Sequence, residues 1–316
     1  MATRRSVRKA ASTSKMSGSS KVMVLGNMKA SAAATRLAAM GDVGLARDIL
    51  RNVQRGKDVK FAVFSFGGKK PDPIYKYTEH AFGYIPKAAG PDDVDIKDAG
   101  NIQADMTLKN VALKVTLDRL RVFAYPGGGI HTVLFDFYAQ HQTETLNETQ
   151  DLHFAQKYRV HEGGGAGISG YPVFIGLKVG DQGVSFKCST VNVRNESDQK
   201  LLDFMSGDVF TKGIQLINQV NPVLPIVSGF ATGIMSAFSK RNDNVAVQDF
   251  YLGLDFSAIA TRAQLREGSY VAVQVQDASA WNWMDWVFKP LTGQVVSRQD
   301  GKPVPLNYVV FSVSKM

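Results

Sequence analysis

The sequence predicts a mainly β fold: an antiparallel β-sandwich or jelly-roll-like domain with a short N-terminal helix and an inserted helical hairpin at about residues 207–239. Three observations support this prediction. Beyond residue 57, at least eight short segments alternate apolar and polar residues with a period of two, as half-buried strands do. Turn-forming Gly, Pro and Asp residues separate them, which is typical of sandwiches. Helical periodicity occurs only at residues 29–56 and 207–239.

Length and composition allow one large domain with appendages. The chain has 316 residues, of which 44% are hydrophobic and 21% are charged, so it can bury a substantial core. We expect a basic, disordered arm at residues 1–28, a helical segment at 29–56, and a β-sandwich domain at 57–316 that carries the insert 207–239. No internal repeat is visible.

The net charge of +9 is concentrated in the first part of the chain. Residues 1–41 contain eight Lys or Arg residues and no acidic residue, whereas the remaining chain is almost neutral. Such a segment can bind the phosphates of a nucleic acid or an anionic lipid surface. A transit peptide and a solubilising tail stay open as alternatives. The cations expected to contact an anionic partner are Arg4, Arg5, Arg8, Lys9, Lys15 and Lys21.

The helical segment at 29–56 is rich in Ala, Leu, Arg and Met. Its apolar residues recur at helical spacing, and Gly56 is a plausible stop. The stripe consists of Val43, Ala46, Ile49, Leu50 and Val53.

In the β region, the pattern of apolar and polar residues predicts local irregularities. Residues 59–66 (VKFAVFSF) are predicted to form a strand. Apolar residues occupy the odd positions from Val111 to Leu117 and the even positions from Leu120 to Ala124. This change of parity near Asp118 predicts a β-bulge or a strand that moves between sheets. GDQG at 180–183, between two apolar runs, predicts a hairpin turn.

The insert has an unusually long uncharged run, the 27 residues from Gly213 to Ser239. Read as a helix from Pro225, it places Ile226, Phe230, Ile234 and Phe238 on one stripe. Gly229 and Gly233 would permit close approach of a second helix. The hairpin is predicted to cover a sheet, with contact to another subunit of a homo-oligomer or to a membrane surface as alternatives. No permanent transmembrane span is expected, because Pro222 and Pro225 interrupt the run.

Two motifs contain residue types that bind ligands, but for each we favour a simpler structural interpretation. GAGISG at 165–170 has the glycine spacing of a dinucleotide-binding turn, but a strand-like run follows where the phosphate-binding helix should begin. We therefore expect a loop between strands. Clustered aspartates can bind calcium, yet their spacing does not fit an EF-hand loop, so a solvated acidic turn is favoured. These aspartates are Asp92, Asp93, Asp95 and Asp98.

The three tryptophans all fall within WNWMDW, at Trp281, Trp283 and Trp286. They are predicted to anchor a core, with binding to sugar faces or to a membrane interface as alternatives. The five histidines form no metal-ligand pattern, and no catalytic motif occurs. We therefore expect no catalytic residues, cofactors or metal ligands, and an enzyme is less expected than a binding protein.

Cys188 is the single cysteine, which favours the cytoplasm or another reducing compartment. The predicted function is a non-catalytic binding or effector module whose basic arm and apolar hairpin contact a partner or an anionic surface. The alternative is a self-assembling coat-like (capsid-type) protein whose arm binds nucleic acid. In layout, though in no motif, the chain resembles the coat proteins of small viruses.

Overall fold

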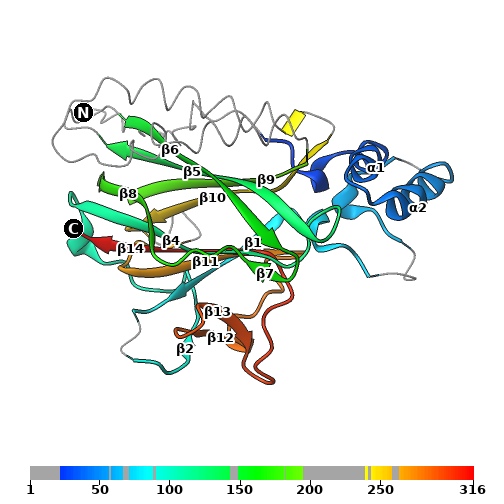
Figure 1. The fold of residues 1–316 in the computed structure, drawn as a ribbon. Coiled ribbons are helices and arrows are strands. Elements are labelled where there is room, and N and C mark those ends of the chain that lie inside the picture. Colours follow the sequence, from blue (N-terminus) through cyan, green and yellow to red (C-terminus); the bar gives the residue numbers. More distant parts are fainter. Residues whose placement is uncertain are drawn as a thin grey trace, which may run out of the picture.

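The computed structural model describes residues 22–56, 58–66, 71–87, 90–142, 149–181, 183–194, 239–240, 243–257 and 263–316. These residues form a mainly β fold with antiparallel sheets, as predicted, and contain two α-helices. Figure 1 shows two large sheets lying one above the other, with the helices at one end. Short 3₁₀ turns connect several elements, namely η1 (Leu25–Asn27), η2 (Phe61–Val63), η3 (Ile74–Lys76), η4 (Met106–Leu108) and η6 (Trp283–Asp285).

The helical segment consists of two helices, α1 (Ala30–Ala39) and α2 (Val43–Val53), rather than one. Gly41 separates them with φ +98°, a conformation that other residues rarely adopt. Of the predicted α2 stripe, Ala46 and Ile49 are buried, whereas Leu50 is 42% exposed. Only part of the stripe therefore faces the core. Helix α2 ends before Gly56, as expected.

The first sheet has seven strands in the order β3-β1-β11-β14-β4-β7, with β8 also paired to β4. All of these pairings are antiparallel. Strands from both the first and the last part of the chain form this sheet, so strands that are neighbours in the sheet are far apart in sequence. The strands are β1 (Glu79–Ile85), β3 (Lys97–Asp98), β4 (Ala112–Val122), β7 (Gly164–Gly165), β8 (Tyr171–Lys178), β11 (Gly268–Val275) and β14 (Tyr308–Lys315).

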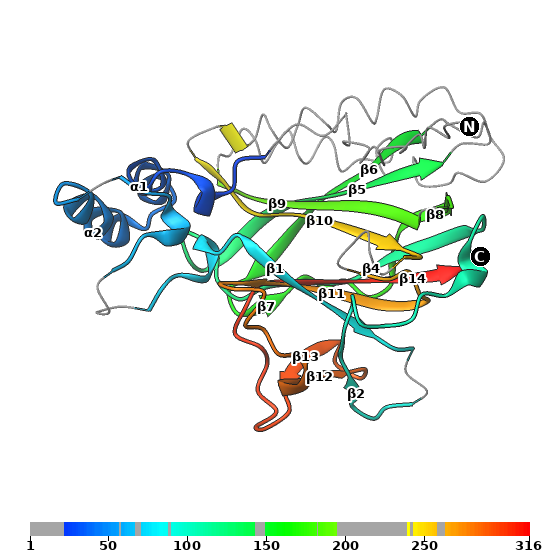
Figure 2. The ribbon, with the colours of Figure 1, turned by 180° about the vertical axis from the view of Figure 1, so that it is seen from behind.

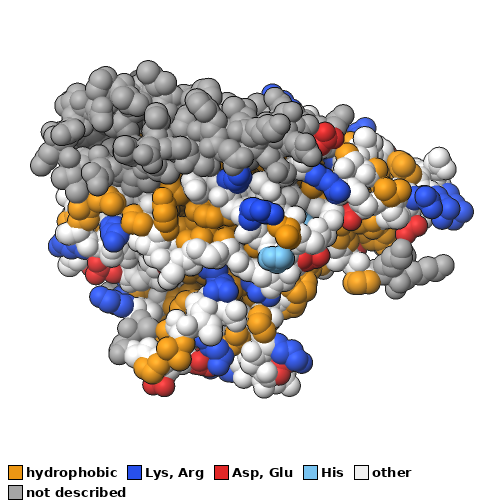
Figure 3. Space-filling model, viewed as in Figure 1, with side chains coloured by type: hydrophobic (Ala, Val, Ile, Leu, Met, Phe, Trp, Pro, Cys, Tyr) orange, Lys and Arg blue, Asp and Glu red, His pale blue; other side chains and the backbone are white. Residues whose placement is uncertain are grey.

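The second sheet has four strands in the order β10-β9-β5-β6. They are β5 (Ile130–Gln142), β6 (Thr149–His161), β9 (Gly183–Val193) and β10 (Asn244–Asp255). A third, small sheet contains β2 (Val94–Asp95), β12 (Trp286–Lys289) and β13 (Gln294–Ser297). It packs on the outer side of the first sheet and projects from the body of the molecule (Figure 3).

The main core lies between the two large sheets, which Figure 2 shows from behind. Phe137 of β5 is 1% exposed, and its ring centroid lies 5.3 Å from that of Phe186 and 5.1 Å from that of Phe311 on β14. Contacts of this kind join the two sheets directly. On the outer face of the second sheet, Val22 and Val24 pack in a separate small cluster, although the sequence assigns residues 22–28 to the arm.

A buried polar clasp joins the sheets at one end. Asn307 is fully buried, and its Oδ1 accepts hydrogen bonds from the backbone N–H groups of Phe123 and Ala124. Its Nδ2 donates to Gln274 Oε1 at 2.8 Å. Gln274 lies on β11 and donates in turn to the carbonyl oxygen of Val247 on β10, in the second sheet. The clasp therefore ties both sheets through hydrogen bonds as well as through apolar packing.

Three local predictions can be judged from the strands. The parity change near Asp118 is confirmed, because the β4–β14 register shifts between Val310 and Phe311, opposite Asp118. The strand predicted at 59–66 is wrong: the chain there forms η2, flanked by residues outside any named strand.

The hairpin predicted at 180–183 is also wrong. β8 pairs with β4 in the first sheet, whereas β9 pairs with β5 and β10 in the second, so this turn carries the chain between sheets. A turn sequence specifies a reversal of the chain, but it does not specify which strands then pair.

Candidate functional site

The candidate site is an open cleft of about 500 Å³ beside strand β1, which we call the tryptophan cleft. It lies where β3 stops covering the edge of β1, because β3 pairs only with Gly83 and Tyr84. The loop that follows β11 forms its other wall. The lining residues are Glu79, His80, Ala81, Phe82, Asp98, Gly100, Asp277, Ala278, Ser279, Trp281 and Trp283.

The tryptophans form one cluster at this cleft. Trp283 is 5% exposed and belongs to the core between the first and third sheets. Its ring lies against Gly83, where a Cβ would come within 2.9 Å of it, so only glycine leaves room there. Trp281 stacks on Trp286 with ring centroids 5.2 Å apart and contacts Trp283 edge-on. The predicted core role therefore holds for Trp283, while Trp281 and Trp286 are half-buried.

Three carboxylates surround these rings. Glu79 Oε2 accepts a hydrogen bond from the backbone N–H of Ala278 at 2.9 Å. Asp277 accepts from the hydroxyl and the backbone N–H of Ser279, and these bonds lower the pKa of Asp277. Asp98 accepts from the backbone N–H of Gly100. These bonds use one oxygen of each carboxylate: Oε2 of Glu79, Oδ1 of Asp277 and Oδ1 of Asp98.

The electrostatic balance of the cleft is negative. No Lys or Arg lines it among the residues that the structure describes. Burial lowers the pKa of His80 to about 4, so this side chain is neutral at pH 7. The indole Nε1–H of Trp281 is buried and has no acceptor in the described part of the protein. The aromatic faces and carboxylate oxygens of the cleft suit a small organic cation, whereas the unused donor needs an acceptor.

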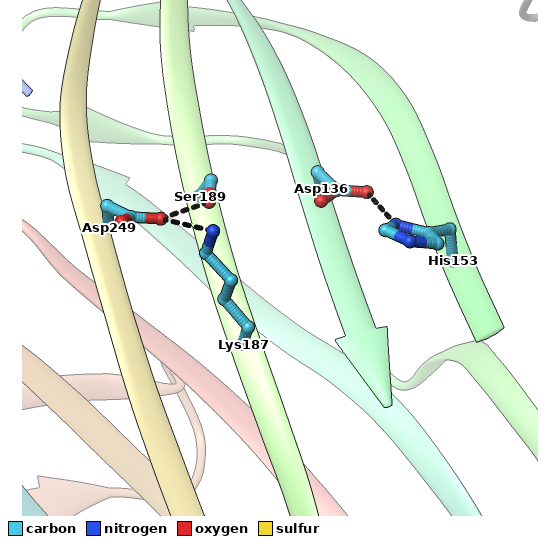
Figure 4. Close-up of polar contacts among 5 residues, drawn as sticks. All are labelled: Asp136, His153, Lys187, Ser189 and Asp249. Atoms are coloured by element: carbon cyan, nitrogen blue, oxygen red, sulfur yellow. Dashed lines mark hydrogen bonds and ion pairs between the residues drawn. The ribbon is translucent and has the colours of Figure 1, made fainter. Parts of the chain in front are cut away.

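A second cluster of ionisable groups lies on the outer face of the second sheet (Figure 4). Asp136 of β5 contacts His153 of β6, with Oδ1 and Nδ1 3.2 Å apart. On the neighbouring strands, Asp249 accepts a hydrogen bond from Ser189 Oγ and pairs with Lys187 Nζ at 3.3 Å. Burial raises the pKa of Asp249, and Lys187 opposes this effect.

This second cluster has catalytic residue types without a catalytic arrangement. A nucleophilic serine needs a base that accepts its proton and that a carboxylate orients. Here Ser189 donates to Asp249, while His153 contacts a different carboxylate, Asp136. The register places Asp249, Ser189 and Asp136 in one row across β10, β9 and β5, so these contacts link adjacent strands.

Most residues predicted as sites fall outside the described part of the chain. This applies to the arm cations Arg4, Arg5, Arg8, Lys9, Lys15 and Lys21, and to the insert residues Ile226, Gly229, Phe230, Gly233, Ile234 and Phe238. Among the described residues, no helix is long and apolar enough to cross a membrane.

The acidic group at 92–98 does not converge on one point. Asp93 pairs with Lys289 at 3.4 Å and Asp95 with Arg298 at 2.9 Å, whereas Asp98 faces the tryptophan cleft. Within the described ranges, no three His, Cys, Asp or Glu side chains are grouped to hold a metal ion.

The glycine-rich run around GAGISG joins strands, as predicted. Gly165 pairs with Arg121 as part of β7, and β8 begins at Tyr171, where a nucleotide-binding turn would need a helix.

No protein-family model, curated protein or solved structure matches this chain.

Two cleft residues escaped the sequence reasoning, Glu79 and Asp277. Asp277 lies four residues before Trp281 in the sequence, and a carboxylate so close to an aromatic cluster indicates a site that combines the two. Glu79 lies almost two hundred residues away in sequence and gave no such signal.

Proposed function

We propose that this protein is a non-catalytic binding module whose tryptophan cleft takes a small organic cation, such as an amine or guanidinium group. The observation that carries this proposal is the composition of the cleft, with three carboxylates and two tryptophans but no neutralising cation among its described lining residues. A cation near an indole face gains about 0.5–1 kcal/mol at an exposed site, and carboxylates add to this.

A sugar is the second candidate ligand, and one observation favours it. The buried Nε1–H of Trp281 needs an acceptor, which a hydroxyl oxygen could provide while its own proton is donated to Asp98 or Asp277. The net negative charge of the cleft still favours a cation, because a neutral sugar leaves the repulsion among the carboxylates unrelieved.

Intrinsic fluorescence tests this proposal, because all three tryptophans of the chain lie in this one cluster. Tetramethylammonium and arginine amide should each change the emission saturably, whereas sodium chloride at equal ionic strength should not. Asp277→Asn and Trp281→Phe should each weaken binding about 2–5-fold, as the loss of about 0.5–1 kcal/mol implies.

Asp181→Asn is the matched control, because it removes a carboxylate from the β8–β9 turn, outside the lining of the cleft. Equal affinity in Asp277→Asn and in this control would refute the cleft as the site. Saturation by glucose but by neither cation would show a sugar ligand instead.

We also propose roles for the arm and the insert. Residues 1–28 would contact an anionic surface or partner, and residues 207–239 would form an amphipathic hairpin that packs on the domain. The coat-like alternative, with jelly-roll connectivity, predicts large assemblies that contain nucleic acid. Size-exclusion mass together with the absorbance ratio at 260 and 280 nm separates the two: a small particle free of nucleic acid supports the binding module.

A further inference from the structure

Two arginines, Arg119 and Arg121, lie on the outer face of β4 with their Cα atoms about 7 Å apart. Leu113, Val115 and Leu117 point into the main core, and without the bulge at Asp118 strict alternation would direct these arginines there as well. The bulge reverses the parity, so that the arginines face outward next to β7 and the third sheet.

Arg121 is a buried cation without an anionic partner among the residues that the structure describes. It is only 5% exposed, and its Nε has no acceptor in the described part of the protein. Its guanidinium carbon lies 6.0 Å from the ring centroids of Phe123 and of Tyr308. The rings stabilise the charge partially. The hydroxyl oxygen of Tyr308 lies near both arginines, but it is a neutral acceptor and does not neutralise their charge. Burial lowers the pKa of Arg121, the nearby Tyr308 raises it, and Arg119 lowers it.

The guanidinium of Arg119 also lacks some of its hydrogen-bond acceptors. Its Nη1 donates to the carbonyl oxygen of Thr292 at 2.7 Å, but its Nε is buried and lacks an acceptor among the described residues. Glycines flank the guanidinium on two sides. A Cβ on Gly165 would lie 3.3 Å from Nε and Nη2, and one on Gly293 would lie 3.3 Å from Nη1. The missing side chains leave the guanidinium close to the backbone on these two sides, and the hydroxyl of Tyr308 lies nearby.

The surroundings provide no carboxylate to neutralise the pair. Neither arginine forms an ion pair with any described Asp or Glu. Figure 3 shows Lys and Arg side chains gathered where β7 approaches the third sheet. Two like charges held together at low exposure are unfavourable unless an anion joins them.

We propose that Arg119 and Arg121 form a binding site for a phosphate-type oxyanion, either free or as part of a phosphate ester. The planar guanidinium fork matches the oxygens of such a group, which would accept hydrogen bonds from the guanidinium N–H groups of both arginines. This site is separate from the tryptophan cleft and does not depend on the function proposed for it. It also gives Gly165 a role: to keep a side chain away from Arg119.

The experiment compares thermal unfolding of the full chain in sodium phosphate and in sodium chloride at matched ionic strength and pH. We expect the melting temperature to rise saturably with phosphate, because a ligand that binds only the folded state stabilises it. In Arg121→Met and in Arg119→Met, the half-saturating phosphate concentration should rise at least tenfold. In chloride, Arg121→Met should melt no lower than the wild type, because it removes a buried charge that lacks a partner.

Arg298→Met is the matched control, because it removes an equal charge from an exposed arginine that already pairs with Asp95. Its phosphate response should equal that of the wild type. If Arg121→Met does not fold, the partly exposed Arg119 carries the test through Arg119→Met and Arg119→Lys. Glycerol 3-phosphate and vesicles that contain phosphatidic acid distinguish a free ester from a lipid headgroup.

The absence of a saturable phosphate response in the wild type would overturn the proposal. So would a response that Arg119→Met and Arg121→Met leave unchanged. A response that depends on both arginines and is equal for phosphate and glycerol 3-phosphate supports a site for the free group, and a response restricted to the vesicles supports a headgroup site.

Discussion

Replacing Asn307 by alanine is expected to destabilise the fold strongly, because it removes the centre of the polar clasp. The Oδ1 of Asn307 accepts from the N–H groups of Phe123 at 2.8 Å and Ala124 at 3.1 Å. Its Nδ2 donates to the carbonyl oxygen of Ala124 at 3.1 Å and to Gln274 Oε1 at 2.8 Å. Alanine leaves two backbone donors and two acceptors without their partner.

The magnitude follows from the burial of these groups. A buried donor without an acceptor costs about 1–3 kcal/mol. Phe123 and Ala124 are partly exposed, so water can reach them in part, and the lower half of this range applies to each. We therefore expect Asn307→Ala to lower the free energy of unfolding by about 2–4 kcal/mol. Asn307→Asp keeps an acceptor for both N–H groups, but it buries an unpaired charge and directs an oxygen at the acceptors of Ala124 and Gln274, so its cost should be no smaller.

Urea unfolding followed by circular dichroism measures this difference, with the m-value as a check on the unfolded state. Asn52→Ala is the control, because Asn52 is exposed and its side chain donates a hydrogen bond to the carbonyl oxygen of Asp48 in helix α2. Its effect should stay within about 0.5 kcal/mol. If Asn307→Ala costs no more than this control, the clasp does not hold the sheets together.

Three further predictions concern other parts of the chain. The pKa of His80 falls from 6.5 to about 4 on burial, so the unfolded state binds the proton more readily than the folded state does. The free energy of unfolding should therefore drop by about 3 kcal/mol from pH 6.5 to pH 4. Unfolding of His80→Gln, measured over the same pH range, should lack this drop, and a pH profile equal to that of the wild type would contradict the prediction. If the six cations of residues 1–21 bind a single-stranded nucleic acid, the log–log salt dependence of affinity should have a slope of about −4.2, and deleting residues 1–21 should abolish binding. Burial of the insert stripe predicts that Phe230→Ala costs about 3–5 kcal/mol and Ser236→Ala almost nothing; a stable Phe230→Ala protein that no longer sediments with liposomes would show membrane contact instead.

Alternation of residues made much of the sheet structure predictable. The odd positions from Leu113 to Leu117 and the even positions from Leu120 to Val122 are buried, so the parity change located the bulge at Asp118 without any knowledge of the partner strand. Alternate residues of a strand share one face, so the positions of the apolar residues show which face is buried without reference to the partner strand.

Pairing and sites were less predictable, because they depend on residues distant in sequence. The turn at 180–183 could be recognised as a turn, yet whether β9 pairs with β8 or with β5 depends on contacts elsewhere. The tryptophan cleft combines Glu79 with the Asp277–Trp283 loop, and the pairing of β1 with β11 brings them together. Arg121 gave no sign in the sequence, since only burial without a carboxylate distinguishes it from a surface arginine.

The position of β14 in the first sheet has a consequence for how the chain is made. β14 lies between β11 and β4, although it is synthesised after both of them. Until residues 308–315 emerge from the ribosome, β11 and β4 each expose an unpaired, apolar edge, and such edges promote association with other chains. Association with other chains therefore competes with folding until this late strand fills the middle of the sheet.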